Sequence, residues 1–120
     1  MARILVVDDS TTMRQMLNFT LVDAGHDVVE AEDGAKALDV ASGRKFDLVI
    51  TEVNMPGMNG LDLVRRLRNL PEFQLTPILV LTTESAQDVK SRGREAGATD
   101  WIVKPFSPDV LLATLTKVLA

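Results

Sequence analysis

The sequence contains no cysteine, a single histidine, a single tryptophan and only 4% aromatic residues. Without cysteine the chain has no disulfide, no thiolate metal ligand and no cysteine nucleophile, a composition typical of a reducing cytoplasm. No apolar run approaches the ~20 residues that a membrane-spanning helix needs. Since no charged and then apolar leader opens the chain, we expect a cytoplasmic protein without a membrane anchor.

Positive charge is also limited, with 13 Lys and Arg against 17 Asp and Glu and a net charge of -4. The chain lacks a basic stripe interleaved with aromatic residues, which argues against direct contact with nucleic acid. Its 120 residues, 46% of them hydrophobic, are near the usual size of one domain and bury a substantial core. We therefore expect one domain over residues 1–120, acting as a monomer.

Strand-like and helix-like segments alternate along the chain. Short apolar and β-branched runs predict five strands, at about residues 3–8, 27–31, 47–52, 77–82 and 100–103. Stripes of apolar residues at steps of three and four predict a helix after each strand. Such alternation is typical of parallel sheets that helices cover on both faces.

Glycine and proline mark where these helices begin and end. Gly25 and Gly43 stop the first two, the third ends before Pro71, and Ser107 with Pro108 opens the fifth. The fourth, over about residues 85–96, has few apolar residues, so we expect it to be the most mobile. The predicted fold is a doubly wound α/β fold, a parallel sheet of order 2-1-3-4-5 flanked by five helices.

Charged and polar residues follow four of the predicted strands. Asp8 and Asp9 end the first strand, Glu52 the third and Thr82 the fourth, and Lys104 follows the fifth. In this topology the carboxyl ends of the strands meet at a crevice where strands one and three diverge. These five side chains are therefore expected to lie close together.

Their chemistry suits a divalent cation and a phosphoryl group. Asp8 or Asp9, Glu52 and the backbone carbonyl of Asn54 are oxygen donors of the kind that Mg²⁺ prefers. The ammonium of Lys104 would neutralise a phosphoryl oxygen, and Thr82 would donate a hydrogen bond to it. Phosphoryl transfer onto a carboxylate requires mainly this positioning and charge neutralisation.

Four motifs in order make the whole chain resemble a known family. They are Val6-Val7-Asp8-Asp9-Ser10, Thr51-Glu52-Val53-Asn54-Met55-Pro56-Gly57-Met58-Asn59-Gly60, Leu81-Thr82-Thr83-Glu84, and Gly97-Ala98-Thr99-Asp100-Trp101-Ile102-Val103-Lys104-Pro105-Phe106. The chain resembles the receiver domains of two-component response regulators, most closely single-domain chemotaxis receivers of the CheY type. The resemblance implies a flavodoxin-like fold and a phosphorylation-controlled switch rather than an enzyme.

The resemblance also implies residue roles. Asp8 and Asp9 become the metal-binding acids, Asn54 lends its carbonyl to Mg²⁺, Thr82 is the switch hydroxyl and Lys104 senses the phosphate. A second set serves the output surface and the lifetime of the phosphoryl group. It comprises Trp101 as the aromatic switch, Lys90 and Arg94 on the partner surface, and Asn54 and Glu84 as residues that tune dephosphorylation. The Lys104-Pro105 peptide bond is implied to be cis.

Implied partners are a histidine kinase upstream and a motor-switch, phosphatase or phosphotransfer protein downstream. Two other sequence features receive simple interpretations. Arg65, Arg66 and Arg68 are interpreted as a solvated helix face, and His26 as inert.

The central position departs from the family pattern, because the acceptor aspartate is replaced by Glu52. The extra methylene moves the carboxylate by roughly 1.5 Å, and misplacements of ~1 Å can cost about 100-fold in rate. Glu52 either imitates the phosphorylated state by reaching Thr82 or Lys104, or disables the site.

Three alternatives stay open beside the switch. One is a pseudo-receiver locked by Glu52 and used only for protein contacts. Another is a Mg²⁺-dependent phosphatase or phosphotransferase. The third, a flavin or nucleotide binder, requires a Ser/Thr/Gly-rich loop where this chain has two acids.

Overall fold

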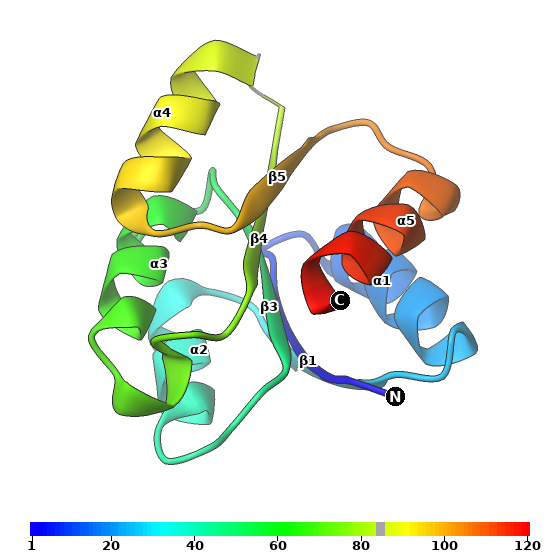
Figure 1. Cartoon of the computed structure of the whole chain (residues 1–120), viewed down its shortest axis with the longest axis horizontal. Coiled ribbons are helices and arrows are strands. Elements are labelled where there is room, and N and C mark those ends of the chain that lie inside the picture. The colour runs from blue at the N-terminus through cyan, green and yellow to red at the C-terminus, as the bar shows by residue number, and fades with distance from the viewer. Residues whose placement is uncertain (84–85) are drawn as a thin grey trace.

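The computed structural model describes residues 1–83 and 86–120, with side chains for all of these except residues 86–90. Within this part of the chain, the strands form one parallel sheet in the order β2-β1-β3-β4-β5 (Figure 1). The strands are β1 (Arg3–Val7), β2 (Asp27–Ala31), β3 (Leu48–Glu52), β4 (Ile78–Thr82) and β5 (Asp100–Val103). The predicted fold class and strand order are confirmed.

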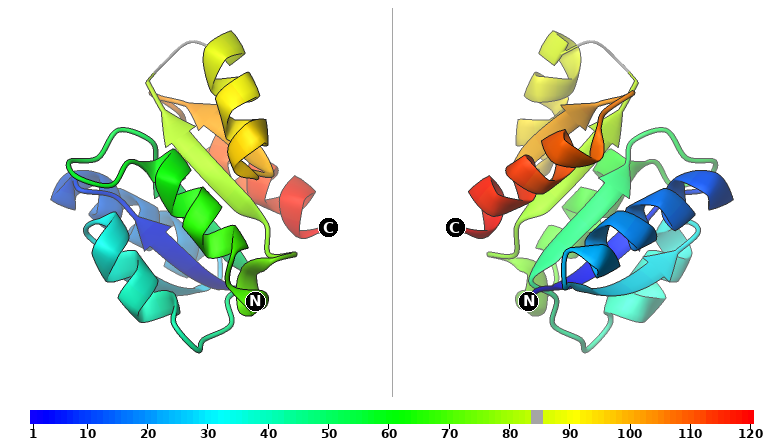
Figure 2. Two further views of the ribbon diagram at one scale, coloured as in Figure 1. Left: turned by 90° about the vertical axis from the view of Figure 1, so that its left-hand side faces the viewer. Right: turned by 90° about the vertical axis from the view of Figure 1, so that its right-hand side faces the viewer.

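Helices cover both faces of the sheet. They are α1 (Thr11–Asp23), α2 (Gly34–Ala41), α3 (Gly60–Arg68), α4 (Ala86–Ala96) and α5 (Pro108–Leu119), with a short 3₁₀ turn η1 (Pro71–Phe73). One face carries α1 and α5 and the other carries α2, α3 and α4, as the two views of Figure 2 show. None of the helices in the described residues is long and apolar enough to cross a membrane.

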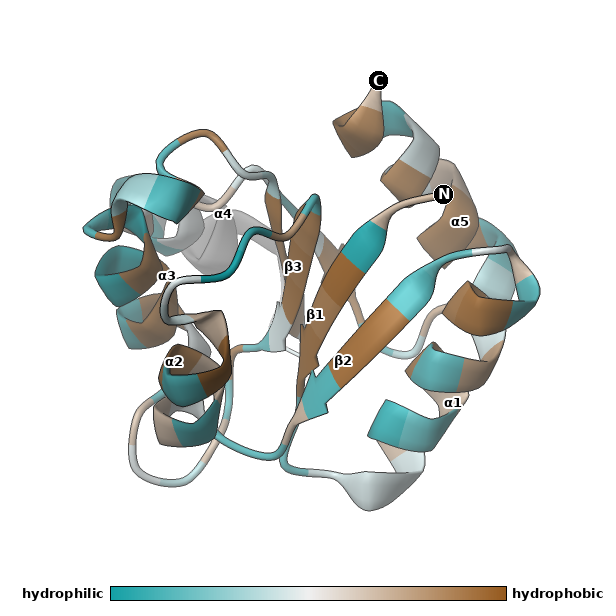
Figure 3. Cartoon of the chain, turned by 90° about the horizontal axis from the view of Figure 1, so that it is seen from below, coloured by the Kyte–Doolittle hydropathy of each residue, from teal (hydrophilic) through white to brown (hydrophobic). Residues whose placement is uncertain are grey.

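Alternation along the strands divides the core into two layers. Leu5 and Val7 of β1 pack with α2 and α3, whereas Ile4 and Val6 pack with α1 and α5. Every residue of β3 and β4 is buried, including the last residue of each strand. Figure 3 shows largely apolar strands flanked by helices that carry both hydrophilic and hydrophobic segments. A polar side chain that ends β3 or β4 therefore lies at the rim of a dry core.

Side-chain caps start most of the helices soon after the preceding strand. Ser10 accepts a hydrogen bond from the Met13 amide, and Asn59 accepts one from the Asp62 amide. Ser107 caps α5 in the same way, with Pro108 at the first helical position, as predicted. The loops after β1 and β5 are consequently short, which keeps the acids and the lysine at the sheet edge.

The interpretation of the arginine run as a solvated face is wrong for Arg68. Arg65 and Arg66 are exposed, but Arg68 is partly buried, and burial lowers the pKa of its guanidinium. Its hydrogen bonds go to three backbone carbonyls, those of Phe73 at 2.6 Å, Thr76 at 2.6 Å and Gly97 at 3.0 Å. Arg68 therefore ties the end of α3 to the segments before β4 and β5.

Candidate functional site

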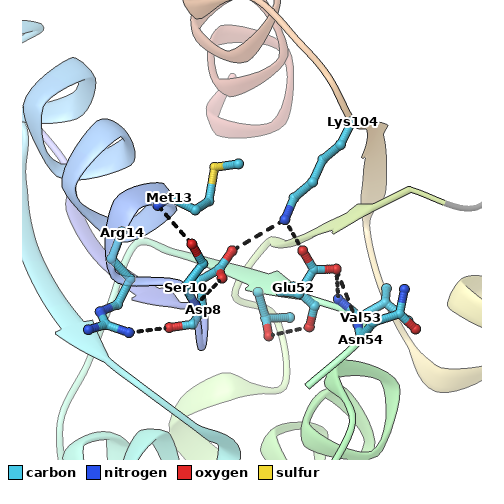
Figure 4. Close-up of polar contacts among 9 residues, drawn as sticks. Asp8, Ser10, Met13, Arg14, Glu52, Val53, Asn54 and Lys104 are labelled. Carbon is cyan, nitrogen blue, oxygen red and sulfur yellow. Dashed lines mark hydrogen bonds and ion pairs between the residues drawn. The ribbon is translucent and has the colours of Figure 1, made fainter. Parts of the chain in front are cut away.

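The ends of three strands bring Asp8, Glu52 and Lys104 together (Figure 4). Asp8 follows β1, and its amide still donates to the Ala31 carbonyl of β2 at 3.2 Å. Glu52 is the last residue of β3. Lys104 follows β5, where its amide donates to the Thr82 carbonyl at 2.7 Å. The predicted convergence at the carboxyl edge of the sheet is present for these residues.

Both carboxylate oxygens of Glu52 have partners. Oε2 forms an ion pair with Lys104 Nζ, while Oε1 accepts hydrogen bonds from the amides of Val53 at 2.9 Å and Asn54 at 3.1 Å. The side chain is only 6% exposed. The contact predicted between the longer acid and Lys104 is therefore present. The carboxylate lies folded against its own loop.

Lys104 is shared between two buried acids. Its Nζ lies 3.5 Å from Asp8 Oδ2 in addition to its contact with Glu52, and its side chain is 14% exposed. Burial raises the pKa of Asp8, although the Ser10 amide, which donates to Oδ1 at 2.8 Å, and the charge of Lys104 both lower it. Two carboxylates and one ammonium therefore leave excess negative charge in a nearly dry site.

Oxygen donors for Mg²⁺ lie on the β1 side of the site. Asp9, which follows Asp8, and Asn54, which lies two residues after Glu52, are both exposed. In the described part of the chain, no three acids or histidines are arranged as a metal cluster, and Glu52 is directed to Lys104 instead. One or two carboxylates with several waters nevertheless satisfy Mg²⁺. Asp8 and Asp9 supply that number of carboxylates, while the predicted third acid, Glu52, is paired with Lys104.

The predicted switch residues lie on β4 and β5. Thr82 ends β4 fully buried and pairs in register with Val103. Trp101 is half-buried on β5, with the guanidinium of Arg94 5.9 Å from its ring centroid. The Lys104-Pro105 bond is cis, as the resemblance implied. Glu84 and the side chain of Lys90 lie outside the described residues, so their predicted roles stay predictions.

Two residues beside the site had no predicted role. Arg14 donates from Nη1 to the carbonyl of Asp8 at 2.6 Å. Gly60 starts α3, and a Cβ there would overlap with the carbonyl of Glu52. Sequence signals existed for both, since Arg14 lies one turn into the helix that follows the acidic pair, and Gly60 follows the capping Asn59.

Comparison with known proteins agrees with this geometry. The family described as response regulator receiver domain matches residues 4–116. A chemotaxis protein CheY homolog of Campylobacter jejuni is 43% identical over 98% of this chain and 92% of its own length. Chemotaxis protein CheY1 of Helicobacter pylori is 45% identical over 98% of this chain and 96% of its own length.

Solved structures support the same assignment. The chemotaxis response regulator CheY4 of Vibrio cholerae superimposes with a TM-score of 0.94 at 48% sequence identity, covering 98% of both chains. This similarity shows that the chain has the CheY-like flavodoxin fold, with strand order 2-1-3-4-5. The family match covers nearly the whole chain. It agrees with the sequence motifs and with the contacts of Lys104 to the two acids. The chain belongs to the response regulator receiver domain family.

Proposed function

We propose that this chain is the receiver of a chemotaxis-type two-component phosphorelay in which Glu52 occupies the acceptor position. CheY-type receivers are signalling switches, and they interact with histidine kinases and with downstream targets such as the flagellar switch. The relatives from Campylobacter and Helicobacter are chemotaxis proteins that this chain covers over 92% and 96% of their length, which supports this class of pathway. The proposed form is a cytoplasmic monomer acting as one domain over residues 1–120.

The ion pair between Glu52 and Lys104 carries the proposal that phosphoryl chemistry is impaired. A phosphoryl group arriving at the acceptor needs the lysine ammonium to neutralise its oxygens. Here Glu52 already uses that ammonium, and its second oxygen is used by the Val53 and Asn54 amides. The attacking oxygen would have to leave its partners first, Lys104 for Oε2 or the two amides for Oε1, which adds to the cost of the extra methylene.

CheY-type receivers generally bind Mg²⁺ in the phosphorylation site, and we assign that ion to Asp8, Asp9 and the carbonyl of Asn54. Mg²⁺ bound there would offset the charge of the acids and of an incoming phosphoryl group. Asp8 supplies a buried carboxylate next to the lysine, and Asp9 supplies an exposed one. Asn54 and Glu84 would tune the rate of dephosphorylation only in a variant that accepts a phosphoryl group, such as Glu52→Asp.

Glu52 also biases the switch. An interaction shifts a conformational balance only by its difference between the two states. Charge-assisted hydrogen bonds to Lys104 contribute about 1.5–3 kcal/mol each, whereas moving a population from 1:99 to 99:1 takes about 5.5 kcal/mol. The pair with Lys104 therefore imitates phosphorylation in part. The affected surface would include Trp101, Arg94 and Lys90.

Phosphoryl uptake tests the proposal directly. Incubation with acetyl phosphate and Mg²⁺, read on Phos-tag gels and by mass spectrometry, should show little or no acyl phosphate on this chain. Glu52→Asp should restore uptake, and Glu52→Gln provides a control without an acceptor. Stable phosphate on Glu52 at the yield of the Asp variant would refute impaired transfer.

A locked pseudo-receiver is the second candidate, because both oxygens of Glu52 are occupied. Trp101 fluorescence separates it from a partly biased switch, by comparing this chain, Glu52→Asp, and Glu52→Asp with beryllofluoride. The biased switch predicts an intermediate signal for this chain. A signal and partner affinity that match the beryllofluoride form fully would make Glu52 a complete activator. A signal of this chain that matches Glu52→Asp without beryllofluoride would favour the locked form.

A further inference from the structure

We propose that Arg14 is a positioning residue for the acidic pair Asp8 and Asp9, and that Glu30 orients Arg14. The guanidinium donates from Nη1 to the carbonyl oxygen of Asp8 at 2.6 Å (Figure 4). That carbonyl belongs to the peptide that joins the two acids. The inference rests on the proposed Mg²⁺ site and names a residue that would control its geometry.

Asp8 is fixed at each of its polar groups. Its amide donates to the Ala31 carbonyl at 3.2 Å, and its Oδ1 accepts from the Ser10 amide at 2.8 Å. The contact with Arg14 fixes the carbonyl. Because this carbonyl lies in the plane of the peptide that leads to Asp9, its direction determines where the chain leaves β1. The relative placement of two candidate ligands therefore depends on Arg14.

Arg14 is itself oriented by neighbours on α1 and β2. Its side chain is 15% exposed, its Nη2 lies 3.4 Å from Thr11 Oγ1, and its Nε lies 3.5 Å from Glu30 Oε1. The other carboxylate oxygen of Glu30 accepts from Asn18 Nδ2 at 3.0 Å. A planar guanidinium can make these contacts in three directions at once, whereas a lysine ammonium on a flexible stem is less well oriented for them.

The sign of the effect on Mg²⁺ distinguishes positioning from simple electrostatics. Arg14 is a cation close to two candidate ligands, so its charge alone repels Mg²⁺, and removing it would tighten binding. Loss of a residue that orients a ligand has the opposite effect and typically weakens metal binding about 10–100-fold. Positioning therefore predicts weaker binding after the removal of a positive charge.

The experiment measures Mg²⁺ affinity by calorimetry in this chain and in the Glu52→Asp background. Arg14→Met should weaken binding about tenfold, the lower end for residues that support metal ligands. Arg14→Lys, which keeps the charge, should also weaken it, and Glu30→Gln should have a smaller effect in the same direction. Arg65→Met is the matched control, because Arg65 is 51% exposed on α3 and pairs with Asp62. It removes the same charge and should leave the affinity unchanged.

A second readout needs no metal. The amide resonances of Asp9 and Ser10 should shift in Arg14→Met without Mg²⁺ and stay in place in Arg65→Met. The midpoint of urea unfolding shows whether Arg14→Met is still folded. If it is not, the Mg²⁺ affinities of Arg14→Lys and Glu30→Gln test the proposal. Unchanged or tighter Mg²⁺ binding in the Arg14 variants would overturn this role while leaving the metal site intact. Absence of Mg²⁺ binding in both parent chains would contradict the metal site and, with it, the inference.

Discussion

The β3 and β1 sides of the site hold acids of similar burial in different ways. Glu52 at the end of β3 has two backbone amides and the lysine as partners. Asp8 after β1 has one amide and only a 3.5 Å contact with the same lysine, and burial raises its pKa. An acid at a strand end is therefore stabilised as a carboxylate according to the donors that its loop supplies. Glu52 has three donors close to its carboxylate. Asp8 has fewer, so a bound cation would balance more of its charge.

Removing Lys104 should give the largest effect, because it deprives both sides of their shared cation. We expect Lys104→Met to lower the free energy of unfolding by about 3–5 kcal/mol, as is typical when one partner of a buried ion pair is lost. Urea unfolding measures this change. The double variant Glu52→Gln with Lys104→Met should recover much of the loss. Equal losses in the single and double variants would mean that Glu52 is not the group left uncompensated.

Gly60 tests the packing on the β3 side. A Cβ at this position would overlap with the carbonyl of Glu52, and backbone atoms cannot give way easily. Gly60→Ala should therefore destabilise the fold by about 3 kcal/mol, the upper range for overpacking. Gly34→Ala is the control, because its nearest obstacle is the flexible Met58 side chain. Similar midpoints in thermal unfolding for the two variants would contradict a rigid contact at Gly60.

Asp8→Asn tests the β1 side and should have the opposite sign. The pKa of Asp8 is raised above its ordinary value of 3.8, because burial penalises its charged form. Stability from this group is present below that value and is lost as the pH rises through the folded-state pKa. At pH 7 and without Mg²⁺, the free energy of unfolding of the variant should therefore be higher than that of this chain. The gain should vanish near pH 3.5. A gain that is independent of pH would exclude this explanation.

Mg²⁺ should act on the β1 side and leave the Glu52 pair in place. At ten times its dissociation constant, the ion should stabilise the fold by about 1.4 kcal/mol or less. Amide shifts on titration should appear at Asp9 and Asn54 and be lost in Asp9→Ala. The midpoint of thermal unfolding should rise with Mg²⁺ concentration over the same range. Unchanged shifts at tens of millimolar Mg²⁺ would refute the site.

Much of the fold could be predicted because its signals are local. Unbroken apolar runs predicted β3 and β4, Gly25 adopts the positive φ of +93° expected after α1, and Ser107 caps α5. The strand order then places Asp8, Glu52 and Lys104 at one edge. Residue type at a strand end was thus enough to predict which side chains approach one another.

The partners of individual side chains were harder to predict, because they depend on contacts far apart in sequence. Arg68 bonds to carbonyls as distant as that of Gly97, which helix periodicity does not reveal. The contact of His26 is a second example, because its Nδ1 accepts a hydrogen bond from the Ala2 amide at 3.0 Å. The direction of Glu52 was also open in the sequence, and its pairing with Lys104 is seen only in the structure.

The position of Lys104 also has a consequence for the order in which the site is assembled. The lysine is 52 residues from Glu52 and 96 from Asp8, so both contacts close long loops of chain. Because closing long loops costs entropy, we expect these contacts to form after the earlier strands have paired. A nascent chain that stops before β5 would carry the two acids with no ammonium between them. Charge balance at the signalling site thus depends on the completion of the last strand, and the site matures together with the C-terminal end of the fold.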